Sequence, residues 1–282
     1  MPYGISIAEG TARTVWMCGD SASTYYIGQL VGWNASAQAA CIGAVVPLAA
    51  ASGLWDATGE KIVAGVVVGL DDLNPSFDST YGLQKSDYAC TTQAHVTARR
   101  AAGVYAGGRG MYNPNDKQPL LEVALIDQTT VLKAPICETG GGVPTVLTLT
   151  AANASGGTTA FAHNASAFTP VPNMYSIYYR TGASAGQWRV GKGTTTTALQ
   201  CTTAFEFDGA ISDTIVGISL KQGLSHIVFG ATPLSTYIDN TLSGGTTNSF
   251  GAFVLYIDAK VSGKEYAMFR LDGIHFTGSV KD

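Results

Sequence analysis

Short apolar segments rich in valine, isoleucine and tyrosine recur along this chain at intervals of about 8–12 residues. No window of helical length repeats its apolar residues at a spacing of about 3.6, and the best helical candidate, Gln93–Ala102, is short and ends at Gly103. This spacing is typical of sandwiches and barrels, so we expect an all-β protein. The expected strands are 26–33, 41–48, 62–70, 95–99, 120–127, 146–150, 175–180, 187–190, 215–219, 226–228, 250–258 and 265–271.

The most apolar of these segments is IVAGVVVGL, residues 62–70, which follows a polar turn at 55–60. It is too short for a helix, and Gly65 and Gly69 interrupt it. A valine-rich strand without polar alternation predicts burial on both faces. The second face could be covered by this chain or by a neighbouring subunit.

The segment ETGGGVP, Glu138–Pro144, breaks the strand pattern, because three glycines before an X-Pro pair form a flexible joint. We place a domain boundary there. Residues 1–138 then form an N-terminal β-rich domain that is rich in alanine and valine. Residues 139–282 form a C-terminal β-sandwich domain that is rich in aromatic residues.

Charged residues make up only 13% of the chain, about half of the usual ~25%, and the chain contains 34 glycines. A surface with so little charge suits a protein that packs against other proteins, or one that is exposed outside a cell. The net charge of −4 argues against a nucleic-acid partner. The longest apolar runs, Ile42–Ala51 and Ile62–Leu70, are shorter than the ~20 residues that span a bilayer. The opening residues MPYGISIAEG contain no basic and apolar leader, so we expect no signal peptide and no membrane association.

No combination of residue types predicts catalysis, a metal or another cofactor. The acids Asp71, Asp72 and Asp78 form an oxygen-rich loop, but they lack the spacing of a calcium loop. The histidines lack the spacing of a metal motif, and the odd number of cysteines without a CxxC pair predicts buried, reduced thiols. These residues are His95, His163, His226 and His275, and Cys18, Cys41, Cys90, Cys137 and Cys201.

Two segments predict contacts with a partner. In GGRG, Gly107–Gly110, flexible glycines would allow Arg109 to reach a neighbour. In MYSIYYR, strand alternation puts one face, with Tyr178 and Arg180, opposite the expected core. That face is either a binding surface or a subunit contact, and the low charge favours the contact. The expected core face consists of Tyr175, Ile177 and Tyr179.

The stretch AASGLWDATGEKIVAGVVVGL, residues 50–70, resembles the head decoration (cement) proteins of tailed bacteriophages, including the lambda type. In that family a turn after a Trp-Asp pair leads into a short strand with a buried end. Two further segments, 168–190 and 262–276, resemble the C-terminal region of structural proteins from marine and cyanobacterial phages. The residues that match the decoration family are Trp55, Asp56, Thr58, Gly65, Val66 and Val67.

This resemblance implies a protein that binds the outside of the expanded capsid as a homotrimer and clamps neighbouring major capsid proteins. Residues 1–138 would be a β-tulip or barrel-like, capsid-binding domain, while the C-terminal domain has no counterpart in the shorter lambda-type proteins. Such a protein is made in the host cytoplasm, acts on the virion exterior and needs no cofactor. Together with the segments above, the expected partner contacts are Trp55, Asp56, Arg109, Tyr178 and Arg180.

Two other functions remain open. The chain could be another capsid or tail component, although a major capsid protein of this type would need a long helix that the sequence does not predict. Its aromatic residues also fit a carbohydrate-binding or receptor-binding virion module. An enzyme is not expected, because no acid–base residues converge in the sequence.

Overall fold

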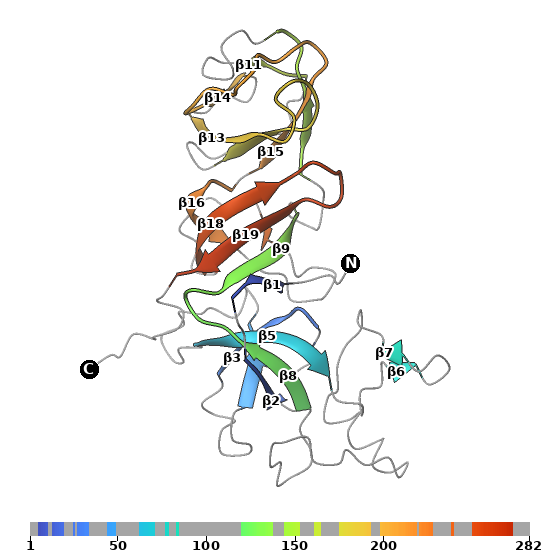
Figure 1. Cartoon of the computed structure of the whole chain (residues 1–282), viewed down its shortest axis with the longest axis vertical. Coiled ribbons are helices and arrows are strands. Elements are labelled where there is room, and N and C mark those ends of the chain that lie inside the picture. Colours follow the sequence, from blue (N-terminus) through green and yellow to red (C-terminus); the bar gives the residue numbers. More distant parts are fainter. Residues whose placement is uncertain are drawn as a thin grey trace, which may run out of the picture. The chain divides into compact units, whose positions relative to one another are not determined.

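The structure, a computed structural model, describes residues 5–10, 13–19, 25, 27–33, 44–48, 62–70, 77–78, 83–84, 120–137, 144–152, 161–164, 175–192, 198–218, 220–227, 238–239 and 250–272. Every regular element within them is a β-strand, which confirms the expected all-β class (Figure 1). These residues therefore include no helix that could cross a membrane.

The chain divides into two compact units, one of residues 1–132, 229–236 and 272–282, the other of residues 133–228 and 237–271. The first break lies before the glycine-rich segment at which the sequence places its boundary. Residues 138–143 of that segment lie outside the described residues. The first unit contains β1 (Ser6–Glu9), β2 (Thr14–Gly19), β3 (Leu30–Trp33), β4 (Ala44–Pro47), β5 (Val63–Leu70), β6 (Phe77–Asp78), β7 (Leu83–Gln84) and β8 (Leu120–Leu125).

Five strands of the first unit pair in a closed ring of order β2-β4-β3-β5-β8. The β2–β4 pair is parallel and the other pairs are antiparallel. Inside the ring, the Tyr25 hydroxyl donates a 2.7 Å hydrogen bond to the Val45 carbonyl, so the buried phenol is satisfied. The remaining core side chains are aliphatic or thioether groups: Met17, Val31, Val45, Ala64, Val67, Leu121 and Val123.

The valine-rich segment of the sequence forms β5, which lies between β3 and β8 in this ring. Most of the strand is covered, since Val63 and Val66 are buried as well as the core-facing Ala64 and Val67, whereas Val68 is exposed. Gly65 is required by close packing: a β-carbon there would collide with the carbonyl oxygen of Ala124. Most of the segment is thus buried within its own chain.

The second unit contains β9 (Val131–Cys137), of which residues from Lys133 onward belong to this unit. One of its sheets has the order β9-β19-β18-β16, and β17 pairs in parallel with β9. The β18–β19 pairing shifts register between Val254 and Tyr256, where a bulge occurs. The bounds of these strands are β16 (Gly223–Ile227), β17 (Ile238–Asp239), β18 (Phe250–Asp258) and β19 (Tyr266–Leu271).

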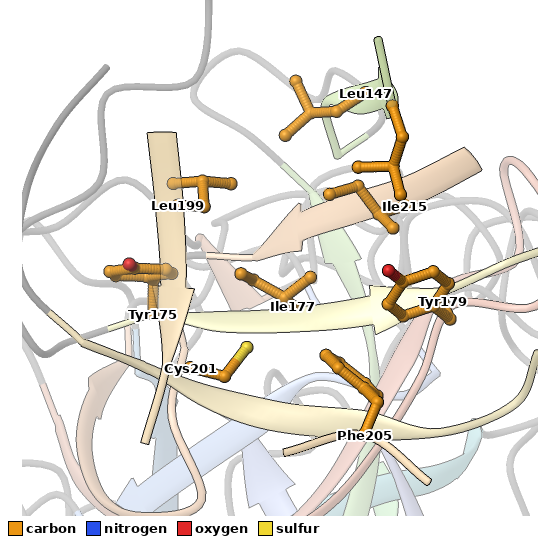
Figure 2. Close-up of a cluster of buried hydrophobic side chains, with 9 residues drawn as sticks. Leu147, Tyr175, Ile177, Tyr179, Leu199, Cys201, Phe205 and Ile215 are labelled. Atoms are coloured by element: carbon orange, nitrogen blue, oxygen red, sulfur yellow. The ribbon is translucent and has the colours of Figure 1, made fainter. Parts of the chain in front are cut away.

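The other sheet of this unit has the order β10-β15-β12-β13-β14-β11. Its strands are β10 (Val146–Thr148), β11 (Phe161–Ala162), β12 (Ser176–Tyr179), β13 (Trp188–Lys192), β14 (Ala198–Cys201) and β15 (Thr214–Ile218). Figure 2 shows the side chains that converge on one face of β12. The expected core residues are all in this cluster, which consists of Leu147, Leu149, Tyr175, Ile177, Tyr179, Leu199, Cys201, Phe205 and Ile215.

Replacing Gly65 should destabilise the barrel strongly. We expect Gly65→Ala to lower the free energy of unfolding by about 1–3 kcal/mol, because the new methyl group must displace the β8 backbone. Val68→Ala, at an exposed position of the same strand, should change it by less than about 0.5 kcal/mol. Urea unfolding of both variants measures the difference. Equal stabilities would contradict the close packing of β5 and β8.

Candidate functional site

Strand β12 is buried on both faces. Its odd-numbered side chains, Ile177 and Tyr179, lie in the aromatic core cluster, while Ser176 and Tyr178 point to the other side. Ser176 is fully buried and Tyr178 is only 2% exposed. The second face is therefore covered by another part of the same chain. The electrostatic contacts of Tyr178 identify that part.

Tyr178 contacts the end of the β18–β19 hairpin. Burial is the main cause that raises its pKa from 10.0 to about 12, and the neighbouring Asp258 and Tyr256 add to the shift. A side-chain hydrogen bond with Asp258 also favours the neutral phenol. The same carboxylate has a hydrogen bond with Tyr266 and raises the pKa of that residue too, after the larger effect of burial. Asp258 thus joins phenol groups of two sheets.

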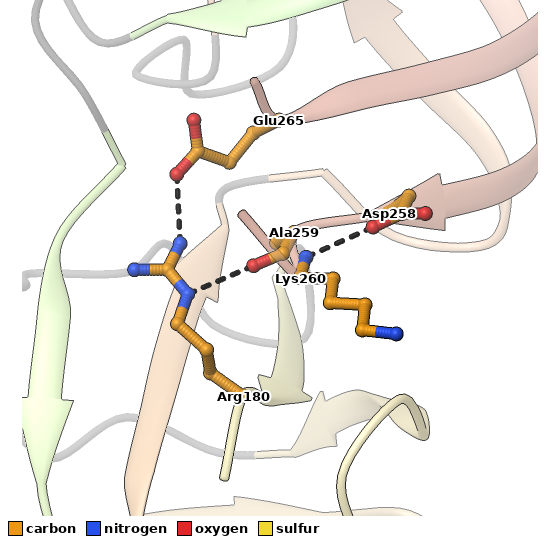
Figure 3. Close-up of polar contacts among 5 residues, drawn as sticks. All are labelled: Arg180, Asp258, Ala259, Lys260 and Glu265. Atoms are coloured by element: carbon orange, nitrogen blue, oxygen red, sulfur yellow. Dashed lines mark hydrogen bonds and ion pairs between the residues drawn. The ribbon is translucent and has the colours of Figure 1, made fainter. Parts of the chain in front are cut away.

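Arg180 makes the second link between β12 and this hairpin (Figure 3). Its Nη2 donates a 2.7 Å hydrogen bond to Oε1 of Glu265, and its Nε donates a 2.9 Å hydrogen bond to the Ala259 carbonyl. The Glu265 side chain is 1% exposed and that of Arg180 is 13% exposed. The guanidinium therefore neutralises a carboxylate that would otherwise be buried without a counter-charge.

These contacts correct the expectation that Tyr178 and Arg180 face a partner subunit. Alternation assigned the two side chains correctly to one face, but β18 and β19 of the same chain cover that face. The other expected contacts, Trp55, Asp56 and Arg109, lie outside the described residues and stay predictions. Among the residues described, no group of three or more His, Cys, Asp or Glu side chains is placed to hold a metal ion.

The β9-β19-β18 sheet presents a second surface that the sequence analysis missed. Along β19, Tyr266, Met268 and Arg270 are half-buried, whereas the alternate residues are fully buried. On β18, Phe253 is opposite Arg270 and Tyr256 is opposite Met268. Alternation in YAMFRL is the signal that predicts this face. We call it the outer sheet face, and it consists of Lys133, Phe253, Tyr256, Tyr266, Met268 and Arg270.

Aromatic rings and cations are combined on the outer sheet face. Phe253 is 47% exposed and Tyr256 is 39% exposed. The Lys133 ammonium lies 3.7 Å from the centre of the Tyr266 ring, and the Arg270 guanidinium lies 6.0 Å from that of Phe253. Tyrosine, phenylalanine, methionine and arginine are the residues enriched where proteins bind one another. The surface is thus chemically suited to a macromolecular contact.

Comparisons with known proteins identify no relative: no protein family, no characterised protein and no solved structure matches this chain.

Removing one partner of the buried ion pair should cost considerable stability. We expect Arg180→Ala to lower the free energy of unfolding by about 3 kcal/mol, because Glu265 stays buried without its counter-charge. The double variant Arg180→Ala/Glu265→Ala should lose less than the sum of the single losses. Denaturant unfolding of the four proteins gives the coupling energy. Strictly additive losses would contradict a direct pair.

Alkaline pH should destabilise the protein through Tyr178. Its pKa of about 12 in the folded chain exceeds the ordinary value of 10.0, so its stabilising contribution is complete below pH 10 and is lost as the pH rises to about 12. We expect Tyr178→Phe to flatten the fall in melting temperature over that range. Val146→Ala, at an exposed position of β10, removes no titrating group and is the control, which should keep the wild-type profile. Parallel pH profiles for wild type and Tyr178→Phe would contradict this assignment.

Proposed function

We propose that this chain is a virion structural protein that binds the outer capsid surface of a tailed bacteriophage and stabilises the head. In this proposal residues 1–138 are a β-tulip or barrel-like, capsid-binding domain, and residues 139–282 are a β-sandwich domain. The protein is not an enzyme. Its partners are the major capsid protein and other copies of itself, as a homotrimer, and its location is the virion exterior after synthesis in the host cytoplasm.

The observation that carries the proposal is the outer sheet face. Its exposed Phe253 and Tyr256, with Met268 and Arg270 beside them, have the composition of a protein interface. Only 13% of the residues are charged, so the chain has few charges with which to keep such a surface soluble. We therefore expect a partner protein to cover it. The resemblance at residues 50–70 to head decoration proteins supports a contact of this kind on a capsid. Many weak contacts on a symmetric lattice then add up through avidity.

A second candidate function is a carbohydrate-binding or receptor-binding module on the virion. The exposed rings of Phe253 and Tyr256 favour it, because flat aromatic rings on a sheet also suit the apolar faces of sugars. A third possibility is another structural role in the capsid or tail. Direct binding assays separate these functions.

The test is co-sedimentation with undecorated, expanded heads of the virus that encodes the chain. Wild-type protein should bind, and Trp55→Ala/Asp56→Ala should bind at least about 30-fold more weakly, because losing an interface aromatic costs about 2 kcal/mol or more. Trp33→Ala, at an exposed position of β3, is the control and should bind normally. Thermal melts of each protein show whether the fold is intact.

The outcomes separate the candidates. Absence of wild-type binding to heads rejects the decoration function, and equal binding by the Trp55→Ala/Asp56→Ala variant removes that turn from the interface. Binding to purified polysaccharides that is lost in Tyr256→Ala, without binding to heads, supports the carbohydrate module instead.

A further inference from the structure

Two loops of the second unit are hydrogen-bonded to each other and expose large apolar side chains. Loop 181–187 joins β12 to β13, and loop 202–213 joins β14 to β15; we call them the loop pair. Ser184 Oγ donates a 2.9 Å hydrogen bond to the Phe207 carbonyl and accepts one of 3.2 Å from the Phe207 N–H. Gln187 makes an equally reciprocal pair with Glu206, at 3.0 and 3.1 Å. The two loops are therefore held together by hydrogen bonds from the side chains of Ser184 and Gln187.

The loop pair holds large apolar side chains in water. Phe207 is 49% exposed and Ile211 is 63% exposed. Loops normally expose polar groups, so two bonded loops that present a phenylalanine and an isoleucine are prepared for a contact. Fixing them in advance lowers the entropy that is lost when a partner binds.

The exposed acids beside Phe207 and the basic residues around the outer sheet face have opposite charge. Glu206 and Asp208 flank Phe207 and are exposed. The outer sheet face contributes Lys133 and Arg270, and the turn between β18 and β19 adds two exposed lysines, Lys260 and Lys264. Asp258, at the end of the face, already binds the Lys260 N–H and the hydroxyls of two tyrosines. A loop pair with exposed acidic and apolar side chains and a basic, aromatic surface therefore occur on one chain.

We propose that the loop pair of one copy docks on the outer sheet face and the adjoining β18–β19 turn of a second copy. Phe207 and Ile211 would lie against Phe253 and Tyr256, with the acids opposite the basic rim. Such a contact joins different surfaces of two identical chains, so repeating it closes a ring when the rotation permits. The inference deepens the proposed function, on which it rests, by naming the surfaces through which copies of the chain meet.

Charge exchange tests the contact. The loop variant Glu206→Lys/Asp208→Lys and the turn variant Lys260→Glu/Lys264→Glu each place like charges together. We expect each to weaken self-association at least about tenfold. The variant that combines all four substitutions restores opposite charges and should recover it. Sedimentation velocity over a range of protein concentrations measures association, and added salt should weaken it in the wild type.

Apolar substitutions test the same contact without changing charge. Ile211→Ala and Tyr256→Ala should each weaken self-association, whereas Val146→Ala, at an exposed position of β10, should not. Circular dichroism confirms that each variant is folded. The inference is overturned if the wild type stays monomeric, if folded charge variants associate normally, or if the combined variant fails to recover. Binding of a polysaccharide by a monomeric wild type, lost in Tyr256→Ala, also overturns it.

These measurements distinguish the inference from the proposed function. Association that follows the charge exchange, in a protein that does not bind heads, supports the self-contact and rejects the decoration function. If the wild type binds heads but stays monomeric, and the charge variants bind heads equally well, the decoration function is supported and the self-contact is rejected.

Discussion

The second unit depends on one strand that is packed on both faces. From Ser176 to Tyr179 every side chain of β12 is almost fully buried, so the strand serves two layers at once. On one side it supplies Ile177 and Tyr179 to the aromatic core, and on the other Tyr178 meets the β18–β19 hairpin. Burying a phenol there requires a polar partner, which Asp258 provides. Apolar packing, the contact of Asp258 with Tyr178 and the pair of Arg180 with Glu265 together join the two sheets.

Eleven of the nineteen strands in the described residues were predictable, because period-two patterns and turn residues are local signals. The segments expected at 62–70 and 250–258 are β5, Val63–Leu70, and β18, Phe250–Asp258. The strands that were missed have weaker local signals. Strand β9 has the sequence VLKAPIC, and a lysine and a proline within an apolar run argue against a strand. The segment is nevertheless a strand, because it pairs with β17 and is buried on one face. Tertiary pairing overrides propensity in such segments.

The candidate site was less predictable, because alternation reveals which residues share a face and not what covers that face. It grouped Tyr178 with Arg180 correctly, but Ala259 and Glu265, which bind Arg180, lie some eighty positions away in the sequence. Similarly, Phe253 and Arg270 become neighbours only through the β18–β19 register, which the bulge near Val254 shifts. Long-range contacts of this kind decide which aromatic residues stay exposed.

The charged residues of this chain have two different roles, one in the interior and one at the surface. Arg180 and Glu265 are removed from solvent and fix the position of the hairpin, since an unpaired buried carboxylate would be too costly to retain. Lys133 and Arg270 instead lie over aromatic rings at the surface, and Phe253 and Tyr256 stay exposed beside them. With so few charges elsewhere, the sign of each surface group contributes more to the choice of partner than it would on an ordinary protein. The self-contact proposed above would therefore be selected by opposite charge around an aromatic centre.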